Sequence, residues 1–486
     1  MKEVCDTYSN MPTFEELRNE RLKKLEILRA REIDPYPIDS FRDTEINKFL
    51  EKFEAYEKNA NQIVLAGRVR SIRVHGKAAF LDLEDFSGKV QIFATLEKTK
   101  EFSLLIDTLD SGDILECKGN AYTSKTGQES LALASWRFLA KSILPLPSEW
   151  FGLKEKEERF RRRYLDMVLN AQVKERLWKA SLTLKEIRKF LDTAGFLEMK
   201  TPVLQPLAGG ALAKPFHTHL NALDMDLYLR IAPELYLKRL LVGGFEKIYE
   251  LGEVFRNEGM DRDHNPEFLM LELYWAYQNW EGLMKFTEEW LFAVAQNIGA
   301  PLATPPWSRK EFETLFEEYT GIIYANANEK KLLTYAKEKK LVINRALSKG
   351  KIADEIFKKI VQPQLKNPIF ITKLPLDISP FAKQLEGDKS RTARFILYID
   401  SLQLVNGFSE INDPLDQEMR FKDQQEAKER GDEEITEYDK DYIDALSYGM
   451  PSAAGLGLGV DRFIMVLTKA SSLREIIAFP LMRIKE

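Results

Sequence analysis

The sequence predicts an α+β fold with a small β-barrel near the N-terminus and one large mixed domain after it. Short strands broken by turn signals fill residues 63–144, which is typical of a barrel. From about residue 174 onward, helical segments alternate with strands. We expect a helical extension at 1–60, the barrel at 61–145, a linker at 146–172 and the large domain at 173–486.

The composition excludes several classes of protein. No apolar run approaches the ~20 residues of a membrane span, and residues 1–10 lack the pattern of a signal peptide. Cys5 and Cys117 indicate neither a disulfide framework nor a zinc site, so we expect a cytoplasmic protein that binds no membrane. A formal net charge of −5 argues against a basic coat, although a local patch can still bind RNA.

The extension and the linker each carry a basic stretch that can be interpreted in two ways. Leucines at positions 17, 22, 25 and 28 predict a charged helix at residues 13–32. Four arginines lie within residues 159–163 of the linker. Each stretch is either a solvated helix face or a contact to an RNA backbone.

The barrel strands are expected at residues 63–70, 79–84, 90–94 and 114–122. With a two-residue alternation, the aliphatic side chains of the second and third strands face the interior, which leaves Phe80 and Gln91 outside. An outer aromatic ring and an amide suit stacking on an unpaired base and hydrogen bonding to it. The alternative is ordinary surface decoration.

Familiar nucleotide and metal motifs are absent from the large domain. No glycine-rich loop ends in Lys-Ser or Lys-Thr, so a P-loop is not predicted. Gly455–Gly459 resembles a dinucleotide fingerprint only loosely, since no acidic residue follows at the required distance. His217 and His219 are closely spaced, but a hydrogen-bonding role suits them better than metal ligation. No metal site is predicted from the histidines.

Two strands of the large domain are expected to carry polar groups into one cleft. Arg256 ends the strand at 247–256, and Phe268, Glu272 and Tyr274 share one face of the strand at 268–276. A half-buried sheet with a solvent face would show the same pattern.

The C-terminal part repeats this arrangement. Asn406, Phe408 and Glu410 share one strand face, and Arg462 follows a glycine-rich turn. Because arginine carries a permanent charge on a planar fork, Arg256 and Arg462 can clamp a phosphate from two sides.

At these residues the sequence resembles the class II aminoacyl-tRNA synthetases. Phe196–Pro202, Phe255–Phe268 and Gly457–Arg462 are similar, in order, to the three signatures of that family. Arg230–Lys238 and Asn406–Glu410 resemble its lysine enzymes more than its aspartate or asparagine enzymes. The N-terminal part is similar to the barrel of those enzymes, so the resemblance covers essentially the whole chain.

The resemblance implies an OB-type barrel that reads the anticodon of tRNA(Lys), a class II catalytic domain that binds lysine and ATP, and a homodimer. It places Phe80 and Gln91 on anticodon-reading positions. The residues it assigns to lysine are Gly210, Glu234, Glu272, Tyr274, Asn406, Phe408 and Glu410. The residues it assigns to ATP are Arg256, Asn257, Glu258, His264, Asn265, Phe268, Gln403, Leu404, Gly459, Val460, Asp461 and Arg462.

These assignments predict a reaction that needs no general base, because the lysine carboxylate is already ionised when it attacks ATP. Catalysis then depends on positioning and on charge stabilisation. Arg256 is expected to hold the α-phosphate, Arg462 the γ-phosphate, and Phe268 to stack on adenine. Glu410 and Tyr274 are expected to bind the lysine ε-ammonium, because a buried ammonium requires a carboxylate partner.

Magnesium is expected with ATP, but one feature of the family is missing. Members usually carry two glutamates that hold Mg²⁺, and those positions are Ile396 and Gln403 here. We therefore predict weaker Mg²⁺ binding than in the relatives.

Two other functions stay open at this point. One is a catalytically impaired synthetase that serves as an RNA-binding module. The other is a paralogue that attaches a lysine-like group to a protein such as elongation factor P. Such paralogues lack the barrel, so the barrel favours tRNA.

Overall fold

The computed structural model describes residues 13–147, 155–211, 213–344, 347–429 and 438–484. The chain forms two compact units, Met1–Glu155 and Lys156–Glu486. The finer division of the chain at residues 60, 145 and 172 stays a prediction. Within the described ranges, no helix combines the length and the apolar character that crossing a membrane requires.

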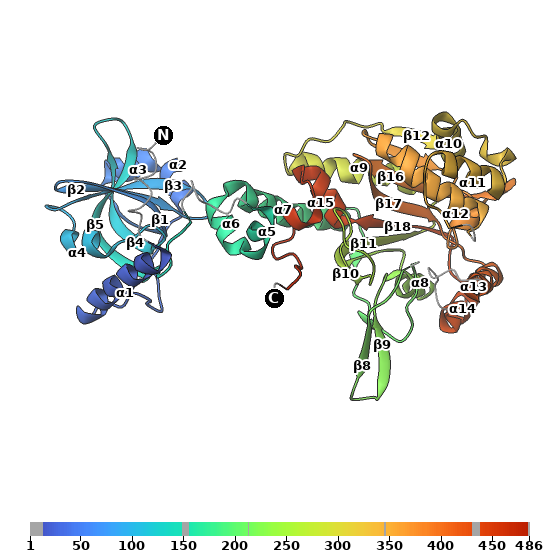
Figure 1. Ribbon diagram of the computed structural model, residues 1–486, viewed down its shortest axis with the longest axis horizontal. Helices are drawn as coiled ribbons and strands as arrows, with labels where there is room; N and C mark the ends of the chain where they lie inside the picture. Colours follow the sequence, from blue (N-terminus) through green and yellow to red (C-terminus); the bar gives the residue numbers. More distant parts are fainter. Residues whose placement is uncertain (1–12, 148–154, 212, 345–346, 430–437, 485–486) are drawn as a thin grey trace, which may run out of the picture. The chain divides into compact units, whose positions relative to one another are not determined.

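The first unit contains a closed five-stranded barrel, which is drawn in blue and cyan in Figure 1. Its strands are β1 (Gln62–His75), β2 (Ala78–Glu84), β3 (Lys89–Thr95), β4 (Ile114–Thr123) and β5 (Glu129–Ala140). They close in the order β1-β2-β3-β5-β4, and β3 and β5 are the parallel pair. The predicted barrel is confirmed.

The side chains of β2 and β3 alternate between the barrel core and its outer face. Leu81 and Ile92 are fully buried, whereas Phe80 and Gln91 are half-buried on the outside. This alternation is the one that the sequence predicts.

Among the described residues of this unit, four helices accompany the barrel: α1 (Phe14–Ala30), α2 (Ile46–Glu51), α3 (Phe53–Asn59) and α4 (Phe102–Thr108). Helix α1 begins with a capping box, in which Thr13 and Glu16 satisfy each other's backbone N–H groups. Its buried Arg21 donates hydrogen bonds to the carbonyl oxygens of Ser111 and Leu144. At least this arginine of the basic stretch therefore anchors the helix instead of contacting RNA.

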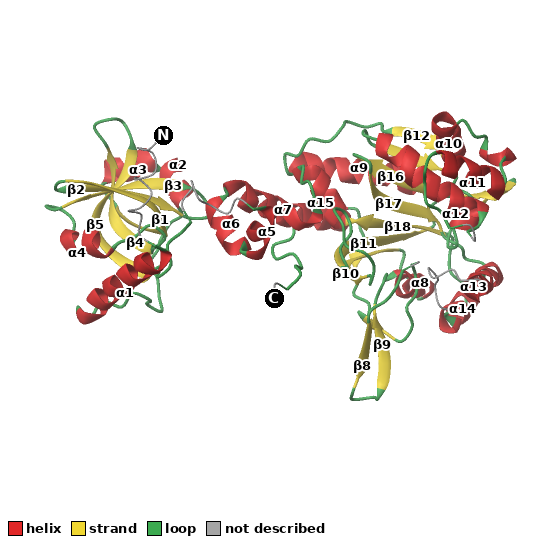
Figure 2. Cartoon of the chain, in the orientation of Figure 1, coloured by secondary structure: helices red, strands yellow, loops and turns green. Residues whose placement is uncertain are grey.

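The second unit is built on an eight-stranded sheet, whose central strands are clear in Figure 2. In spatial order the strands are β12 (Ser308–Glu311), β13 (Ile369–Thr372), β16 (Arg394–Ile399), β17 (Leu402–Ser409), β18 (Ala453–Gly459), β11 (Glu267–Ala276), β10 (Lys247–Phe255) and β6 (Leu197–Glu198). The sheet is antiparallel except at its two ends, where β12 pairs with β13 and β6 pairs with β10 in parallel. The predicted antiparallel sheet is confirmed.

Two smaller sheets complete the strands of this unit. One consists of β7 (Leu204–Gln205), β8 (His217–Leu220) and β9 (Met225–Leu229), and the other of β14 (Gln384–Leu385) and β15 (Asp388–Thr392). On β8, His219 lies 2.8 Å from Asp226, in agreement with the hydrogen-bonding role predicted for the closely spaced histidines.

Three helices cover one face of the large sheet: α7 (Ala171–Thr193), α9 (Trp280–Asn297) and α15 (Val460–Thr468). Their apolar side chains share a core with Leu271 and Leu273 of β11. The opposite side chains of β11, Glu272 and Tyr274, reach a cavity on the other face. The predicted division of this strand into an apolar and a polar face is confirmed.

The helices on the cavity side form two further groups with separate cores. Helices α8 (Glu234–Val242), α13 (Pro414–Glu429) and α14 (Lys440–Ser447) surround one core. Helices α10 (Phe312–Thr320), α11 (Glu329–Glu338) and α12 (Lys349–Ile356) form the other, together with Ile396 and Tyr398 of β16. The helices α5 (Lys156–Arg161) and α6 (Arg163–Leu169) precede α7.

Candidate active site

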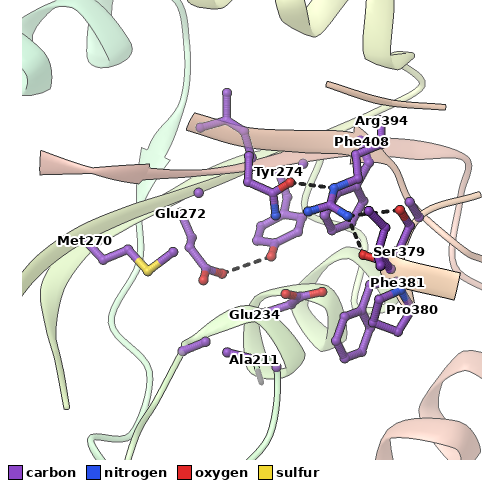
Figure 3. A pocket seen from close by; sticks show the side chains of 18 of the residues that line it. Ala211, Glu234, Met270, Glu272, Tyr274, Ser379, Pro380, Phe381, Arg394 and Phe408 are labelled. Atoms are coloured by element: carbon purple, nitrogen blue, oxygen red, sulfur yellow. Dashed lines mark hydrogen bonds between the residues drawn. The ribbon is translucent and has the colours of Figure 1, made fainter. Parts of the chain in front are cut away.

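A cavity of about 220 Å³ opens on the polar face of the large sheet (Figure 3). Strands β11, β17 and β18 form one wall, helix α8 contributes Glu234, and the segment Ile378–Ala382 closes another side. Figure 3 shows Glu272 and Tyr274 projecting from one strand toward Glu234. The cavity is therefore lined by acidic and aromatic side chains from elements far apart in the sequence.

Six of the seven residues that the resemblance assigns to lysine line this cavity. They are Gly210, Glu234, Glu272, Tyr274, Asn406 and Phe408. The seventh, Glu410, is 1% exposed and lies directly beyond the end of β17, in contact with Lys238. The structure brings these residues together, while their individual roles stay predictions.

Burial changes the pKa values of the acidic side chains in the site. Burial raises the pKa of Glu272 well above its usual range, raises that of Glu234, and raises that of Glu410 to about 8. The Tyr274 hydroxyl donates a hydrogen bond to Glu272 Oε2 at 2.9 Å. A cation that enters the cavity would favour the ionised form of all three carboxyls.

Gly455 of β18 gives two residues of the site room to pack closely against the strand. Gly455 lies opposite Tyr274 on one neighbouring strand and Phe408 on the other. A Cβ at this position would approach Glu410 Oε1 to 2.3 Å and the Tyr274 ring to 2.5 Å. Gly455 thus lets Glu410 and Tyr274 pack against β18, and we call the part of the cavity that Gly455, Tyr274 and Phe408 line beside Glu410 the slot.

Arg394 of β16 also lines the cavity, and the sequence prediction missed it. Its Nε donates to Asn406 Oδ1 at 2.8 Å, and its Nη1 donates to the Ile378 carbonyl at 2.5 Å and to Ser379 Oγ at 2.9 Å. The arginine therefore fixes Asn406 against the segment that closes the cavity. Its position two residues before Ile396, on the same strand face, is the sequence signal that could have identified it.

Arg256 lies at the end of the same cavity with much of its hydrogen-bonding capacity unused. Its guanidinium carbon lies 5.2 Å from the centre of the Phe268 ring, and Nη2 makes one long contact of 3.5 Å to the Ile231 carbonyl. Nε is buried and has no hydrogen-bond partner among the described residues. Such an arginine is available to bind an anion.

Arg462 is held by two segments that are distant in the sequence. Its Nε donates to the Asp263 carbonyl at 3.1 Å, its Nη1 donates to the Gln403 carbonyl at 3.1 Å, and its Nη2 lies 2.9 Å from His264 Nε2. The neighbouring Asp461 accepts a hydrogen bond from the Leu269 N–H, and burial raises its pKa to about 6. The second and third signatures therefore meet in space.

The other residues assigned to ATP lie around this meeting point. The Asn257 N–H donates to the Lys214 carbonyl, Glu258 Oε1 accepts from the Lys214 N–H, and Asn265 donates to the Glu267 carbonyl. The side chains of Leu404 and Val460 are buried in the main apolar core, so these two could contact ATP only through backbone atoms. A Cβ on Gly459 would lie 3.8 Å from the Leu404 carbonyl oxygen.

The positions where the family holds Mg²⁺ do not fit a carboxylate-bound ion in this chain. Ile396 is 6% exposed and packs in the core of the α10–α12 group. Gln403 is half-buried and pairs with Tyr398 across the strands. Neither side chain carries a charged oxygen, which Mg²⁺ prefers.

The outer face of the barrel carries a row of three aromatic rings. The centre of the Phe80 ring lies 5.1 Å from that of Phe93, which lies 5.3 Å from that of Tyr122. Gln91 is on the same strand as Phe93, two residues before it. The sequence prediction did not name Phe93 and Tyr122, although the alternation that selects Gln91 also selects Phe93.

Two family profiles match the chain and agree with these features. The family described as "tRNA synthetases class II (D, K and N)" matches residues 155–483, and the family described as "OB-fold nucleic acid binding domain" matches residues 63–146. Fold and site thus define a class II tRNA synthetase with an OB-fold domain.

Relatives that are similar over nearly the whole chain indicate which family of class II synthetases this is. The lysine–tRNA ligase of Thermoanaerobacter sp. (strain X514) is 42% identical over 98% of both chains. That of Carboxydothermus hydrogenoformans is 44% identical over 96% of this chain and 98% of its own. That of Pelotomaculum thermopropionicum is 43% identical over 100% of this chain and 98% of its own. The chain belongs to the lysine–tRNA ligase family.

Proposed function

We propose that this chain activates lysine with ATP to form lysyl-AMP and then transfers the lysyl group to tRNA(Lys). The observation that carries the proposal is that Glu234 and Glu272 line one cavity and that Glu410 lies beside it, against the lining residue Gly455. Aspartate and asparagine offer no second ammonium to such a site, and an aspartate side chain would be repelled by it. Lysine brings two ammonium groups.

In this proposal the lysine side chain enters the slot above Gly455, between Tyr274 and Phe408. Its ε-ammonium then reaches Glu410 Oε1 at the end of the slot, where a Cβ would otherwise clash. The remaining polar residues of the cavity, including Glu234 and Asn406, surround the α-amino end. The carboxylate is left facing Arg256, which has unused donors.

Activation is an in-line displacement at the α-phosphorus of ATP. A lysine carboxylate oxygen forms the new bond to phosphorus while the bond to pyrophosphate breaks, and no proton has to be removed. Arg256 stabilises the charge on the α-phosphate, and Arg462 binds the γ-phosphate end. A terminal ribose hydroxyl of tRNA then attacks the lysyl carbonyl carbon and AMP leaves, the hydroxyl proton passing to solvent or phosphate.

ATP brings Mg²⁺ with it, and the chain itself offers no carboxylate at position 396 or 403. We propose that the ion is held by phosphate oxygens and water, with Gln403 as a neutral neighbour. This arrangement predicts a higher Mg²⁺ requirement than in relatives with two glutamates.

The barrel is proposed to read the anticodon through Phe80 and Gln91. The aromatic row extends the stacking surface to Phe93 and Tyr122.

We further propose that the enzyme works as a homodimer in the cytoplasm. Strand β6 supports the dimer because it is an edge of the large sheet and exposes 55% of Leu197.

Charging of purified tRNA(Lys) with labelled lysine tests the proposal directly. Label on tRNA(Lys), dependent on ATP, is the expected result. Label on elongation factor P in place of tRNA would support the protein-modifying paralogue. Tight tRNA binding without any lysyl-AMP formation would support the impaired synthetase.

A further inference from the structure

We propose that Lys238 is a positioning residue of the lysine site, whose ammonium holds Glu410 so that one carboxylate oxygen faces the incoming substrate. This inference rests on the proposed lysine site. Lys238 lies on α8, one turn after Glu234, and its side chain is fully buried. It does not line the cavity itself, so it would act through its neighbours.

The two oxygens of Glu410 face different directions. Oε2 lies 2.5 Å from Lys238 Nζ. Oε1 lies 2.3 Å from the place that a Cβ on Gly455 would take, beside the Tyr274 ring, and therefore next to a residue that lines the cavity. Neither oxygen accepts a hydrogen bond of good geometry from the described residues. One oxygen is thus engaged by the ion pair, and the other is left for a ligand.

Lys238 also joins two walls of the site. Its Nζ lies 2.5 Å from Glu234 Oε1 as well, so a single ammonium bridges the carboxylate of α8 and the carboxylate beyond β17. The rings of Tyr274, Phe381 and Phe408 surround it at 5.8, 5.2 and 5.5 Å from their centres. Four of these five neighbours line the cavity, and three of the four are aromatic.

Lys238 supplies a cation in direct contact with two acidic residues of the site. Its ammonium pairs with the carboxylates of Glu234 and Glu410, whereas Arg256 and Arg394 are the cations in the cavity lining itself. Without Lys238, the carboxylates of Glu234 and Glu410 would lose this partner. At least one of them would then take up a proton in preference to staying ionised while buried.

The pH dependence of lysine binding follows from the groups that face Lys238. These are Glu234 on its own helix, Glu410 directly after β17, Glu272 and Tyr274 on β11, and Tyr442 on α14. Burial raises the pKa of Glu410, and Lys238 lowers it. Removal of the ammonium would move this pKa higher still, so Glu410 would be ionised only at more alkaline pH.

The test compares Lys238→Met, Lys238→Gln, Glu410→Gln and the double variant Lys238→Met/Glu410→Gln by ATP–pyrophosphate exchange. KM is measured for lysine and for ATP at pH 7 and pH 9. Lys141→Met is the matched control, because Lys141 is equally buried and also bridges two carboxylates, Asp110 and Asp113, but lies in the barrel unit. Thermal unfolding of each variant accompanies the kinetics.

Lys238→Met is expected to raise the KM for lysine at pH 7 by about tenfold or more and to leave the KM for ATP within about twofold. The increase should shrink at pH 9. In the Glu410→Gln background it should nearly vanish, because the residue through which Lys238 acts is then neutral. Lys141→Met should lower the unfolding temperature without a selective change for lysine. Lys238→Gln is expected to behave like Lys238→Met and decides the question if the methionine variant does not fold.

A merely structural role would give a different pattern. An equal rise in both KM values, or a full effect of Lys238→Met in the Glu410→Gln background, overturns the inference. If Glu410→Gln raises the KM for lysine but neither Lys238 variant does, the inference fails and the proposed lysine site stands. If Glu410→Gln itself has no effect, the proposed lysine site is wrong and the inference falls with it.

Discussion

Gly455→Ala provides a sharp test of the slot that we assign to the lysine side chain. The added methyl group would lie 2.3 Å from Glu410 Oε1 and 2.5 Å from two carbons of the Tyr274 ring. Both neighbours are buried, so neither can move aside without disturbing its packing. Overpacking of a filled interior costs about 1–3 kcal/mol, and displacement of Glu410 would move the carboxylate that should bind the lysine ammonium.

That cost corresponds to a rise in the KM for lysine of about 5-fold to 150-fold, at roughly 1.4 kcal/mol per factor of ten. The assay is ATP–pyrophosphate exchange with lysine varied at saturating ATP, followed by ATP varied at saturating lysine. The KM for ATP should change little, because the atoms nearest to the added methyl group belong to Glu410 and Tyr274 and not to Arg256 or Arg462. Thermal unfolding measures the part of the cost that appears in the fold.

Gly457→Ala is the matched control, since Gly457 lies two residues further along the same strand and also lines the cavity. There a Cβ would meet the terminal methyl group of Met270 at 2.5 Å, and the flexible end of a methionine can swing away. We expect a small effect at this position. A KM for lysine within twofold of wild type in Gly455→Ala, or an equal loss in Gly457→Ala, would refute the assignment of the slot.

Four further predictions test other parts of the account. Phe80→Ala and Gln91→Ala should weaken charging of tRNA(Lys) by about 1–3 kcal/mol per base contact and leave ATP–pyrophosphate exchange intact. An equal loss in both assays would contradict the proposal that the barrel reads the anticodon independently of lysine activation. Arg394→Met removes the hydrogen-bond donors to Asn406, Ile378 and Ser379. It should raise the KM for lysine about tenfold or more. An unchanged KM for lysine would show that Asn406 does not need the hydrogen bond from Arg394. Gln403→Glu should lower the Mg²⁺ concentration needed for half-maximal exchange, and no shift would show that position 403 is remote from the ion. The additional substitution Ile396→Glu should lower this Mg²⁺ concentration further. It should also destabilise the fold, because it buries a carboxylate in an apolar core. Leu197→Glu should convert a homodimer to a monomer in light scattering, and a wild-type monomer would rule out the proposed assembly.

Strand alternation was sufficient to predict the polar wall of the site. On β11 a two-residue period separates Leu271 and Leu273 in the core from Glu272 and Tyr274 in the cavity, and the structure has the same division. The same rule places Phe80 on the outer face of the barrel. These predictions succeed because the burial of a strand residue depends mainly on its parity.

Strand alternation could not place Lys238, and it could not predict the partners of Arg394. A lysine on a helix is normally assigned to solvent, and only the approach of Glu410, more than 170 residues later in the chain, makes its burial tolerable. Arg394 is likewise buried because Asn406 and the carbonyl of Ile378 accept its donors. Contacts of this kind arise from the tertiary fold and leave no periodic pattern in the sequence.

Ile396 shows a limit of a different kind. The resemblance to the family marks this residue as a departure, but it does not predict where the side chain lies. In the structure it completes the core of the α10–α12 group, which explains why an apolar residue is stable there. What replaces its family role stays a prediction for the Mg²⁺ titration.

The central claim is that the acidic cavity selects lysine for adenylation. ATP–pyrophosphate exchange with each of the twenty amino acids, supplied one at a time with saturating ATP and Mg²⁺, tests it most directly. The account predicts that lysine stimulates exchange far more strongly than any other amino acid. Exchange stimulated best by aspartate or asparagine, or no exchange with lysine at any Mg²⁺ concentration, would contradict it.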